Sequence, residues 1–192
     1  MPPFLLIGLG NPGASYAGNR HNAGFMVAEQ LIADYGFSKP ARKFGGALSE
    51  GAVGGVKIYI FCPLGYMNTS GGPASQAAGF YKISPERIIV MHDELDIPLG
   101  KLKVKRGGGN GGHNGLRSLD AHLGADYTRI RFGIGHPGDK DRVSDYVLSD
   151  FAKAEWPVVE RMAKAISKHL PLLLKGDDAG FMNKVTLTTQ ET

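Results

Sequence analysis

Short apolar runs alternate along the chain with longer segments in which apolar residues recur every three or four positions. A continuous or strictly alternating apolar run predicts a strand, and the wider spacing predicts a helix with one buried face. We therefore expect strands at 4–9, 56–61, 87–91, 101–105 and 129–134, and helices at 22–35, 75–81, 116–123 and 155–174. Gly36 is a natural end for the first helix, and Pro171 is expected to kink or end the last one.

Strands and helices interleave, and Gly54 and Gly55 before the second strand form a turn signal typical of hairpins. This order predicts an α/β fold with one mixed, mostly parallel twisted sheet and helices on both of its faces. No fixed-period repeat, flexible linker or low-complexity tract divides the chain. We therefore expect a single domain spanning residues 1–192.

The composition is that of a folded protein: 192 residues, 42% of them hydrophobic and 21% charged. These values exclude global disorder, and the length is sufficient to bury a substantial core. Cys62 is the only cysteine, so no intrachain disulfide can form and a reducing compartment is indicated. No apolar run approaches the ~18 residues of a membrane span, and the start of the chain lacks the basic segment of a signal peptide. We expect a cytoplasmic protein without membrane association.

The formal net charge of +4 mildly favours a polyanionic partner but is equally what ordinary solubility requires. The distribution of charge is more informative. Lys101, Lys103 and Lys105 alternate on a predicted strand and therefore share one face, about 6.7 Å apart. Arg129 and Arg131 alternate in the same way. Such rows suit a phosphate backbone, but lysines also protect the exposed edge of a sheet.

Glycine makes up 28 of the 192 residues, about twice its usual share of ~7%. The first cluster, GLGNPG at 8–13, follows a predicted strand and matches the dinucleotide-binding pattern G-x-G-x-x-G. That pattern needs a helix directly after the glycines, whereas helical spacing here begins only near residue 22. A dinucleotide site is therefore disfavoured, and a tight turn alone leaves the polar stretch 15–21 unexplained.

Polar side chains follow the predicted strands at their carboxyl ends, where open α/β sheets form ligand crevices. Asn11 and His21 follow the first strand, Asn68 the second and Asp93 the third, and the glycine-rich segment 107–115 leads into a helix. No G-x-S-x-G elbow is present and the single cysteine lies in an apolar strand, so no covalent nucleophile is indicated. A histidine paired with a carboxylate can instead deprotonate water, and asparagine amides can orient a carbonyl and stabilise an oxyanion.

Each of these residues also has a purely structural interpretation. His21 could lie at the surface, and Asn22 and Asn68 could cap helices that begin just after them. Asp93 and Asp96 could belong to a turn. A metal site built from the histidines and aspartates is a further alternative, but no His-x-x-x-His spacing occurs, so we expect neither a metal nor another cofactor.

The motifs also occur in a characteristic order. They are GLGNPG at 8–13, RHNAG at 20–24, MNTSG at 67–71, HDELD at 92–96 and GGGNGGHNG at 107–115, with RIRFGIG at 129–135 and FMNK at 181–184. Together they resemble the signatures of the bacterial-type peptidyl-tRNA hydrolases, in that family's order. The resemblance covers about residues 5 to 185, and five ordered motifs of this length are very specific.

The resemblance implies hydrolysis of the ester between an N-blocked peptide and the 3′-terminal ribose of tRNA, by a water that His21 activates without a metal or a covalent intermediate. It implies that Asp93 orients His21 and that Asn11 helps to tell N-blocked peptides from free aminoacyl groups. The implied substrate-binding residues are Tyr16, Tyr66, Met67, Asn68, His113 and Asn114. The resemblance also implies an enzyme that is metal-free and works as a monomer. Asn19 and Gly65 stand where it often has threonine, and Gly65 could loosen the Tyr66 loop.

The basic row acquires a specific meaning from the resemblance. Lys103, Lys105 and Arg131 are expected to contact phosphates of the acceptor stem and 3′ end of peptidyl-tRNA. Such contacts are independent of sequence and sensitive to salt, which suits an enzyme acting on all tRNAs. A non-catalytic tRNA- or RNA-binding module is the alternative function that the basic row permits. It leaves unexplained why a histidine and an aspartate occur beside three asparagines.

Overall fold

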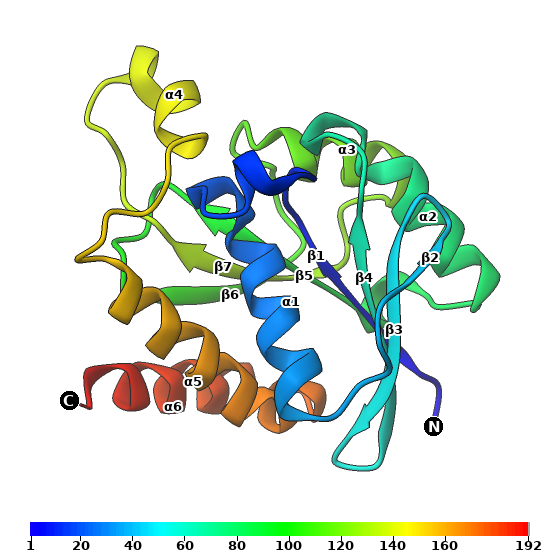
Figure 1. Ribbon diagram of the computed structural model, residues 1–192. Helices are drawn as coiled ribbons and strands as arrows, with labels where there is room; N and C mark the ends of the chain where they lie inside the picture. The colour runs from blue at the N-terminus through cyan, green and yellow to red at the C-terminus, as the bar shows by residue number, and fades with distance from the viewer. Residues whose placement is uncertain (192) are drawn as a thin grey trace.

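In a computed structural model, which describes residues 1–191, seven strands pair into one mixed sheet in the order β2-β3-β4-β1-β5-β7-β6 (Figure 1). The strands are β1 Phe4–Gly8, β2 Ala41–Lys43, β3 Gly46–Val53, β4 Val56–Pro63, β5 Ile88–Glu94, β6 Leu102–Arg106 and β7 Thr128–Gly133. The central strands β4, β1, β5 and β7 are parallel, whereas antiparallel pairs join β2 and β3 at one edge and β6 at the other.

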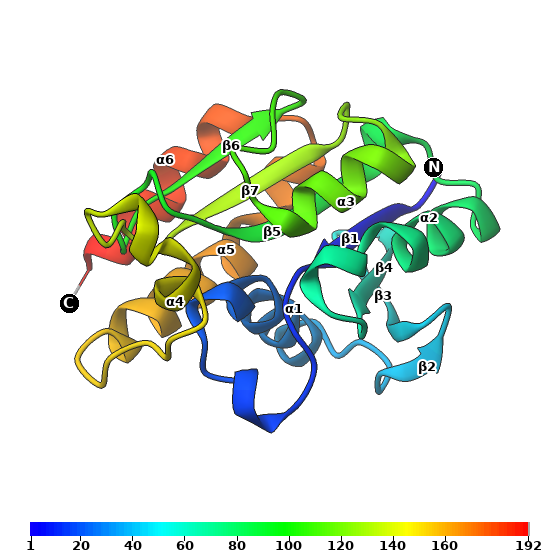
Figure 2. The same cartoon turned by 90° about the horizontal axis from the view of Figure 1, so that it is seen from above.

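Helices cover both faces of this sheet, as predicted. They are α1 Ala23–Asp34, α2 Gly71–Phe80, α3 Asn114–Leu123, α4 Val143–Val147, α5 Trp156–Leu174 and α6 Asp178–Gln190. Short 3-10 helices lie between them: η1 Ala14–Tyr16, η2 Arg20–Asn22, η3 Met67–Thr69, η4 Pro85–Arg87 and η5 Lys140–Arg142. Seen from above, α1, α5 and α6 lie on one side of the sheet and α2 and α3 on the other (Figure 2). None of the helices in the described part of the chain combines the length and apolarity that crossing a membrane requires.

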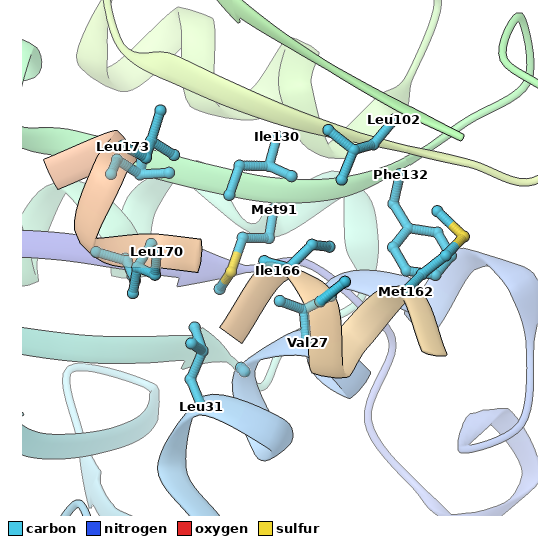
Figure 3. Close-up of a cluster of buried hydrophobic side chains, with 14 of the residues drawn as sticks. Val27, Leu31, Met91, Leu102, Ile130, Phe132, Met162, Ile166, Leu170 and Leu173 are labelled. Atoms are coloured by element: carbon cyan, nitrogen blue, oxygen red, sulfur yellow. The ribbon is translucent and has the colours of Figure 1, made fainter. Parts of the chain in front are cut away.

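The two faces of the sheet carry separate hydrophobic cores. On one face, Val27 and Leu31 of α1 and Ile166 of α5 pack against strand residues such as Met91 (Figure 3). The other core holds α2, α3 and the alternate residues of β1. Since both faces are covered, every residue of β1 is buried and the strand has a continuous apolar sequence instead of an alternating one.

All five predicted strands and all four predicted helices are present, with some changed ends. The second helix begins at Gly71 instead of residue 75. The third strand continues to Glu94, so His92 and Asp93 belong to β5 and do not follow it. The extension has a physical cause: His92 and Asp93 stay in register with β7 as far as its last residues.

The last predicted helix does not end at Pro171, because α5 continues to Leu174. A proline has no N–H to donate, so the carbonyl of Ser167, four residues earlier, loses its helical partner. The hydroxyl of Tyr35 donates to that carbonyl at 2.5 Å. A contact from a distant helix end therefore replaces the bond that the proline removes.

The sequence patterns gave no range for β2, β3, α4 or α6. The turn signal at Gly54 and Gly55 is confirmed, because these residues join β3 to β4 in an antiparallel hairpin. β3 is rich in small and polar residues that form strands poorly. It is nevertheless a strand because it pairs with β4 along its whole length, from Gly46 to Val53. In α6, Phe181, Val185 and Thr189 are the buried residues, spaced four apart, and this stripe is too narrow to stand out in the sequence.

Candidate active site

A cavity of about 610 Å³ opens at the carboxyl ends of the parallel strands. The chain passes from β1 to β4 on one side and then crosses to β5 on the other, and ligand crevices form at such a switch point. Its lining includes Asn11, His21, Tyr66, Met67, Asn68, Asp93, His113 and Asn114. The polar residues that the sequence spreads over a hundred positions therefore meet in one place.

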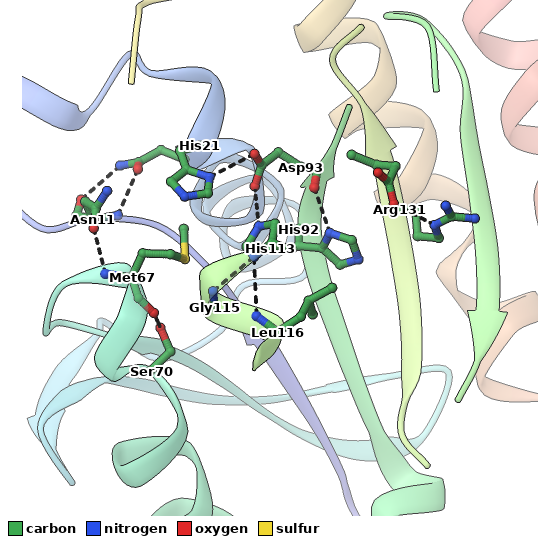
Figure 4. A network of polar contacts seen from close by, with 12 residues as sticks. Asn11, His21, Met67, Ser70, His92, Asp93, His113, Gly115, Leu116 and Arg131 are labelled. Carbon is green, nitrogen blue, oxygen red and sulfur yellow. Dashed lines mark hydrogen bonds and ion pairs between the residues drawn. The ribbon is translucent and has the colours of Figure 1, made fainter. Parts of the chain in front are cut away.

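His21 lies in η2, between β1 and α1, and its ring is buried, which excludes a surface histidine. Its Nδ1 is 2.8 Å from Oδ2 of Asp93 (Figure 4). The approach depends on Gly24 in the first turn of α1. A Cβ at this position would collide with the carbonyl oxygen of Met91 and with the backbone of Leu9. Glycine therefore lets α1 lie directly against the strands and brings η2 to Asp93.

Asp93 is 3% exposed and lies between two imidazoles. Its Oδ2 meets Nδ1 of His21, and its Oδ1 lies 2.7 Å from Nε2 of His113. Burial by itself would raise the pKa of Asp93, but the two rings hold it far below its ordinary value, so the carboxylate is ionised. Burial by itself would lower the pKa of His21, but the charge of Asp93 and its hydrogen bond outweigh burial and raise that pKa above 6.5.

His113 is the N-cap of α3. Its Nδ1 accepts hydrogen bonds from the backbone N–H of Gly115 at 3.1 Å and of Leu116 at 3.3 Å. Because Nε2 meets Asp93, both ring nitrogens are engaged within the protein. Its ring centroid lies 4.9 Å from that of His21 and 5.2 Å from that of His92. Burial lowers the pKa of His92, whose Nδ1 bonds to a backbone carbonyl, so this third imidazole is neutral.

Two asparagines join the loops after β1 and β4. The side chain of Asn22 accepts from the N–H of Asn11 at 2.8 Å and donates to its carbonyl at 3.0 Å. Asn22 thus braces Asn11 and makes no side-chain cap on α1. Oδ1 of Asn11 accepts from the N–H of Met67 at 2.7 Å. A backbone N–H can only donate, so this contact orients the amide of Asn11 and leaves its NH₂ group for the cavity that Asn11 lines.

The remaining predicted substrate residues differ in their exposure. Asn68 in η3 and Asn114 at the start of α3 are exposed and line the cavity. Tyr66 also lines it, with 63% of its surface exposed. Tyr16 does not belong to the lining: it packs edge-on against Tyr66, with ring centroids 6.4 Å apart. Met67 is buried and forms part of the wall.

The predicted basic row lies on β6 and β7, where Lys103 is directly opposite Arg131 and Lys105 opposite Arg129. Opposite residues of an antiparallel pair share one face of the sheet. Lys103 and Lys105 are exposed. Arg131 is partly buried, and its Nε donates to Oε1 of Glu94 at 2.9 Å. Among the described residues neither lysine has an ion-pair partner, whereas Arg131 already has a counter-charge.

Arg129 is not part of the exposed row, contrary to the prediction from its spacing. Only 2% of its surface is exposed, because the glycine-rich segment and α3 cover it. Its guanidinium donates to the carbonyl oxygens of Gly108 and Gly109 and to Oδ1 of Asp120. It fixes the path of the segment that leads to His113.

The sequence leaves open whether residues 135–151 close over the cleft, and the structure places side chains of this segment in the wall of the cavity. They come from the segment between β7 and α5 and include His136, Lys140, Val143, Ser144, Val147 and Leu148. Part of them forms α4, which stands away from the layers in Figure 1. The helix has five residues, too few for a periodic signal, so no pattern in the sequence marks it.

Arg20 connects this segment to the site and was also missed. Its guanidinium donates to Oγ of Ser149 at 2.6 Å, to the carbonyl of Asp150 at 2.8 Å and to Glu155 at 2.7 Å. It also lies over the ring of Tyr146, 4.3 Å from its centroid. The residue next to His21 therefore anchors the end of the segment that lines one side of the cavity.

These features define a class of protein. The cavity lies at the edge of an open α/β sheet and holds an ionised carboxylate next to an imidazole, with amide side chains around them. Such a site is typical of an enzyme that transfers protons and binds a carbonyl group. The family model for peptidyl-tRNA hydrolase matches residues 5–192. The chain belongs to the peptidyl-tRNA hydrolase family.

Individual relatives agree with this assignment. A peptidyl-tRNA hydrolase of Rhodopseudomonas palustris (strain BisB18) is 52% identical over 97% of this chain and 92% of its own length. One of Methylocella silvestris is 52% identical over 95% of this chain and 93% of its own. The crystal structure of peptidyl-tRNA hydrolase from Acinetobacter baumannii superposes with a TM-score of 0.90 at 40% identity, covering 96% of this chain and 95% of that one.

Proposed function

We propose that this chain hydrolyses the ester bond between an N-blocked peptide and the 3′-terminal ribose of tRNA, releasing free tRNA and the peptide. Relatives that are 52% identical over almost the whole chain bear the name of this activity. The observation that carries the proposal is the His21–Asp93 pair, 2.8 Å apart, in the wall of a 610 Å³ cavity. A general base held by a carboxylate needs no covalent intermediate to cleave an activated ester.

In the proposed reaction, Nε2 of His21 removes a proton from a water while the water oxygen attacks the ester carbonyl. His21 bonds to Asp93 through Nδ1, and a carboxylate only accepts, so the hydrogen of the neutral ring is on Nδ1 and the lone pair on Nε2. Asp93 stabilises the imidazolium that forms. Collapse of the tetrahedral intermediate breaks the bond to the 3′ oxygen, and His21 returns the proton to that oxygen.

Asn11 is proposed to select N-blocked substrates. Its carbonyl oxygen is bound to Met67, so it offers the cavity only N–H donors. The first peptide carbonyl of an N-blocked substrate accepts such a bond, whereas the ammonium group of a free aminoacyl ester is itself a donor and carries a positive charge. A site that can only donate therefore disfavours the free aminoacyl group.

The exposed amides of Asn68 and Asn114 are proposed to hold the ester carbonyl and the attacking water, because an amide supplies both a donor and an acceptor. Tyr66, 63% exposed, is proposed to lie against the peptide or the terminal adenosine, with Tyr16 supporting its ring from behind. Met67 contributes an apolar wall.

The tRNA backbone is proposed to lie along Lys103 and Lys105, with Arg131 as a weaker contributor because Glu94 already binds it. The acceptor stem then follows β6 while the 3′ end enters the cavity. We also propose that a single copy of the chain is active, since every residue invoked here comes from one chain, and that it acts in the cytoplasm, where peptidyl-tRNA is made.

The protonation of the site favours a reaction without a metal. Ligand atoms of His21, Asp93 and His113 lie within 4.8 Å of one another, close enough for one ion. However, both ring nitrogens that meet Asp93 bear hydrogen, and a metal requires a bare nitrogen. Nε2 of His113 can lose its hydrogen only if Nδ1 gains one, and Nδ1 faces the N–H groups of α3. The set therefore suits acid–base chemistry better than metal binding.

The decisive experiment is turnover of N-acetyl-aminoacyl-tRNA by the wild type and by His21→Ala. Loss of the general base is expected to lower kcat by ~10²–10⁴-fold, with tRNA affinity unchanged because the lysines of β6 are intact. Prior removal of metal ions with a chelator is expected to leave the wild-type rate unchanged. Undiminished turnover by His21→Ala contradicts the role of His21 as general base. A loss of activity after chelation contradicts a metal-free reaction. Binding of tRNA without any release of the amino acid indicates a non-catalytic binding module.

A further inference from the structure

The position of His113 does not suit a residue that hydrogen-bonds a substrate. Nε2 meets Asp93 and Nδ1 meets two N–H groups of α3, so neither nitrogen is available to a ligand. Its side chain is 10% exposed, whereas its neighbour Asn114 is exposed. Figure 4 shows the ring between Asp93 and the first turn of α3.

The two sets of contacts determine which nitrogen of His113 carries hydrogen. The N–H groups of Gly115 and Leu116 can only donate, so Nδ1 presents its lone pair. The hydrogen of the neutral ring is therefore on Nε2 and is directed at Oδ1 of Asp93.

The carboxylate of Asp93 is consequently held from both sides. One oxygen receives N–H from His21 and the other from His113, at 2.8 and 2.7 Å. The carboxyl group cannot rotate without losing a bond, and this would leave a buried oxygen without a partner. Of the two rings, only His21 has a nitrogen free to take a proton from the cavity.

We propose that His113 is a positioning residue for the proposed reaction: α3 holds it as the neutral Nε2–H tautomer, and it fixes the carboxylate of Asp93 so that the proton taken from water stays on His21. The inference rests on the proposed function for the reaction itself but concerns a contact present in the free enzyme. It replaces the role of substrate ligand for His113 that the resemblance implies.

Other charged groups near these rings are bound elsewhere or line the cavity without a hydrogen bond or ion pair to either ring among the described residues. Glu94 on β5 is bound to Arg131, and Arg20 on η2 is bound to Glu155. His92, on the same strand as Asp93, is neutral. The groups that remain in the cavity lining are Asp96, His136 and Lys140. Asp93 is therefore the charged group in direct contact with both rings.

Two substitutions separate positioning from simple helix capping. His113→Ser keeps an acceptor that can cap α3 but removes the bond to Asp93, and His113→Ala removes both. His169→Ser, at a partly buried histidine of α5, is the matched control, and its kcat and pH profile are expected to equal those of the wild type. For each variant, kcat and KM are measured on N-acetyl-aminoacyl-tRNA and Tm by thermal unfolding. The pKa of His21 is measured by an NMR titration that follows the signals of its ring.

Both His113 variants are expected to lose about 10–100-fold in kcat, with KM within twofold of the wild type. In both variants Asp93 loses the hydrogen bond from Nε2 of His113, so more of its negative charge acts on His21. The pKa of His21 and the acid limb of kcat/KM are therefore expected to rise by about 0.5–1 unit. His113→Ser is expected to melt close to the wild type and above His113→Ala, and yet to remain slow.

Three results overturn the inference. A raised KM with unchanged kcat identifies a substrate ligand, recovery of kcat in His113→Ser identifies a cap and nothing more, and an unmoved His21 titration excludes coupling through Asp93. Absence of turnover by the wild type contradicts the proposed function instead. The NMR titration of the free enzyme still decides the role of His113 in that case.

Discussion

The cavity and the basic face of β6 and β7 are both built from polar residues on neighbouring strands, but the surroundings of their charges are opposite. In the cavity, Asp93 is 3% exposed and bound through both oxygens. On the basic face, Lys103 and Lys105 are exposed and have no ion-pair partner among the described residues. A buried, oriented charge controls a protonation state, whereas an exposed charge contributes attraction that salt screens.

A second contrast lies within the basic face itself. Lys105 and Arg129 are directly opposite each other on β6 and β7. Lys105 is exposed, but Arg129 is covered and binds the carbonyl groups of Gly108 and Gly109. The alternating spacing in each strand therefore puts both cations on one face of the sheet, but their exposure differs. We therefore expect a substitution in the cavity to change the reaction rate, one at the covered Arg129 to change stability, and one at the exposed lysines to change tRNA affinity.

The largest effect is expected from Asp93→Asn in the cavity. Without the carboxylate, the imidazolium formed in the reaction loses its counter-charge, and turnover falls by roughly 10²–10⁴-fold. Burial then acts on His21 unopposed and lowers its pKa. Since His21 must be neutral to accept a proton, the acid limb of kcat/KM moves to lower pH, opposite to the shift expected for His113→Ser. A pH–rate profile measures both changes.

The exposed Asp126 supplies the control for this variant. Asp126→Asn removes the same charge outside the cavity and is expected to preserve the rate and the profile. An acid limb that stays in place in Asp93→Asn contradicts the coupling between Asp93 and His21.

A smaller effect, on stability, is expected from Arg129→Met. The substitution keeps an elongated side chain but leaves the carbonyls of Gly108 and Gly109 without this donor, and Asp120 keeps only the hydrogen bond from the hydroxyl of Tyr127. Removing one member of a buried polar network costs about 3 kcal/mol or more, which lowers Tm by roughly 6–12 °C in a chain of this size. Thermal unfolding measures it. Arg117→Met, on the exposed side of α3, is expected to change the free energy of unfolding by no more than about 0.5 kcal/mol. Equal melting of the two variants contradicts the structural role of Arg129.

The smallest effect is expected from Lys105→Ala on the exposed row. Loss of one phosphate contact is expected to weaken tRNA binding several-fold and to reduce the slope of log K against log salt by about 1. The kcat is expected to stay the same because Lys105 does not line the cavity. Binding measured over a series of salt concentrations tests this. Lys164→Ala on α5 removes an exposed lysine elsewhere and is expected to leave the slope intact. A lowered kcat with an unchanged slope contradicts a phosphate contact.

The sequence was informative where an element has its own strong pattern. The apolar run of β1 and the helical spacing of α5 predicted those elements directly. β3 and α6 lack such patterns and form because β4 and α5 bind them. Within α5, the hydroxyl of Tyr35, 136 positions before Pro171, donates to the carbonyl of Ser167, which Pro171 cannot serve.

For the site, the sequence predicted which residues gather, because the carboxyl ends of parallel strands meet at one edge of a sheet. It thereby placed Asn11, His21, Asn68 and Asp93 together. Only the tertiary structure decided that Arg129 is buried, that Tyr16 lies outside the cavity lining, and that His113 faces Asp93 with its N–H. Spacing along the chain sets the face on which a side chain lies. Burial and protonation depend on which distant atoms cover that face, and those atoms are brought there only by packing of the whole fold.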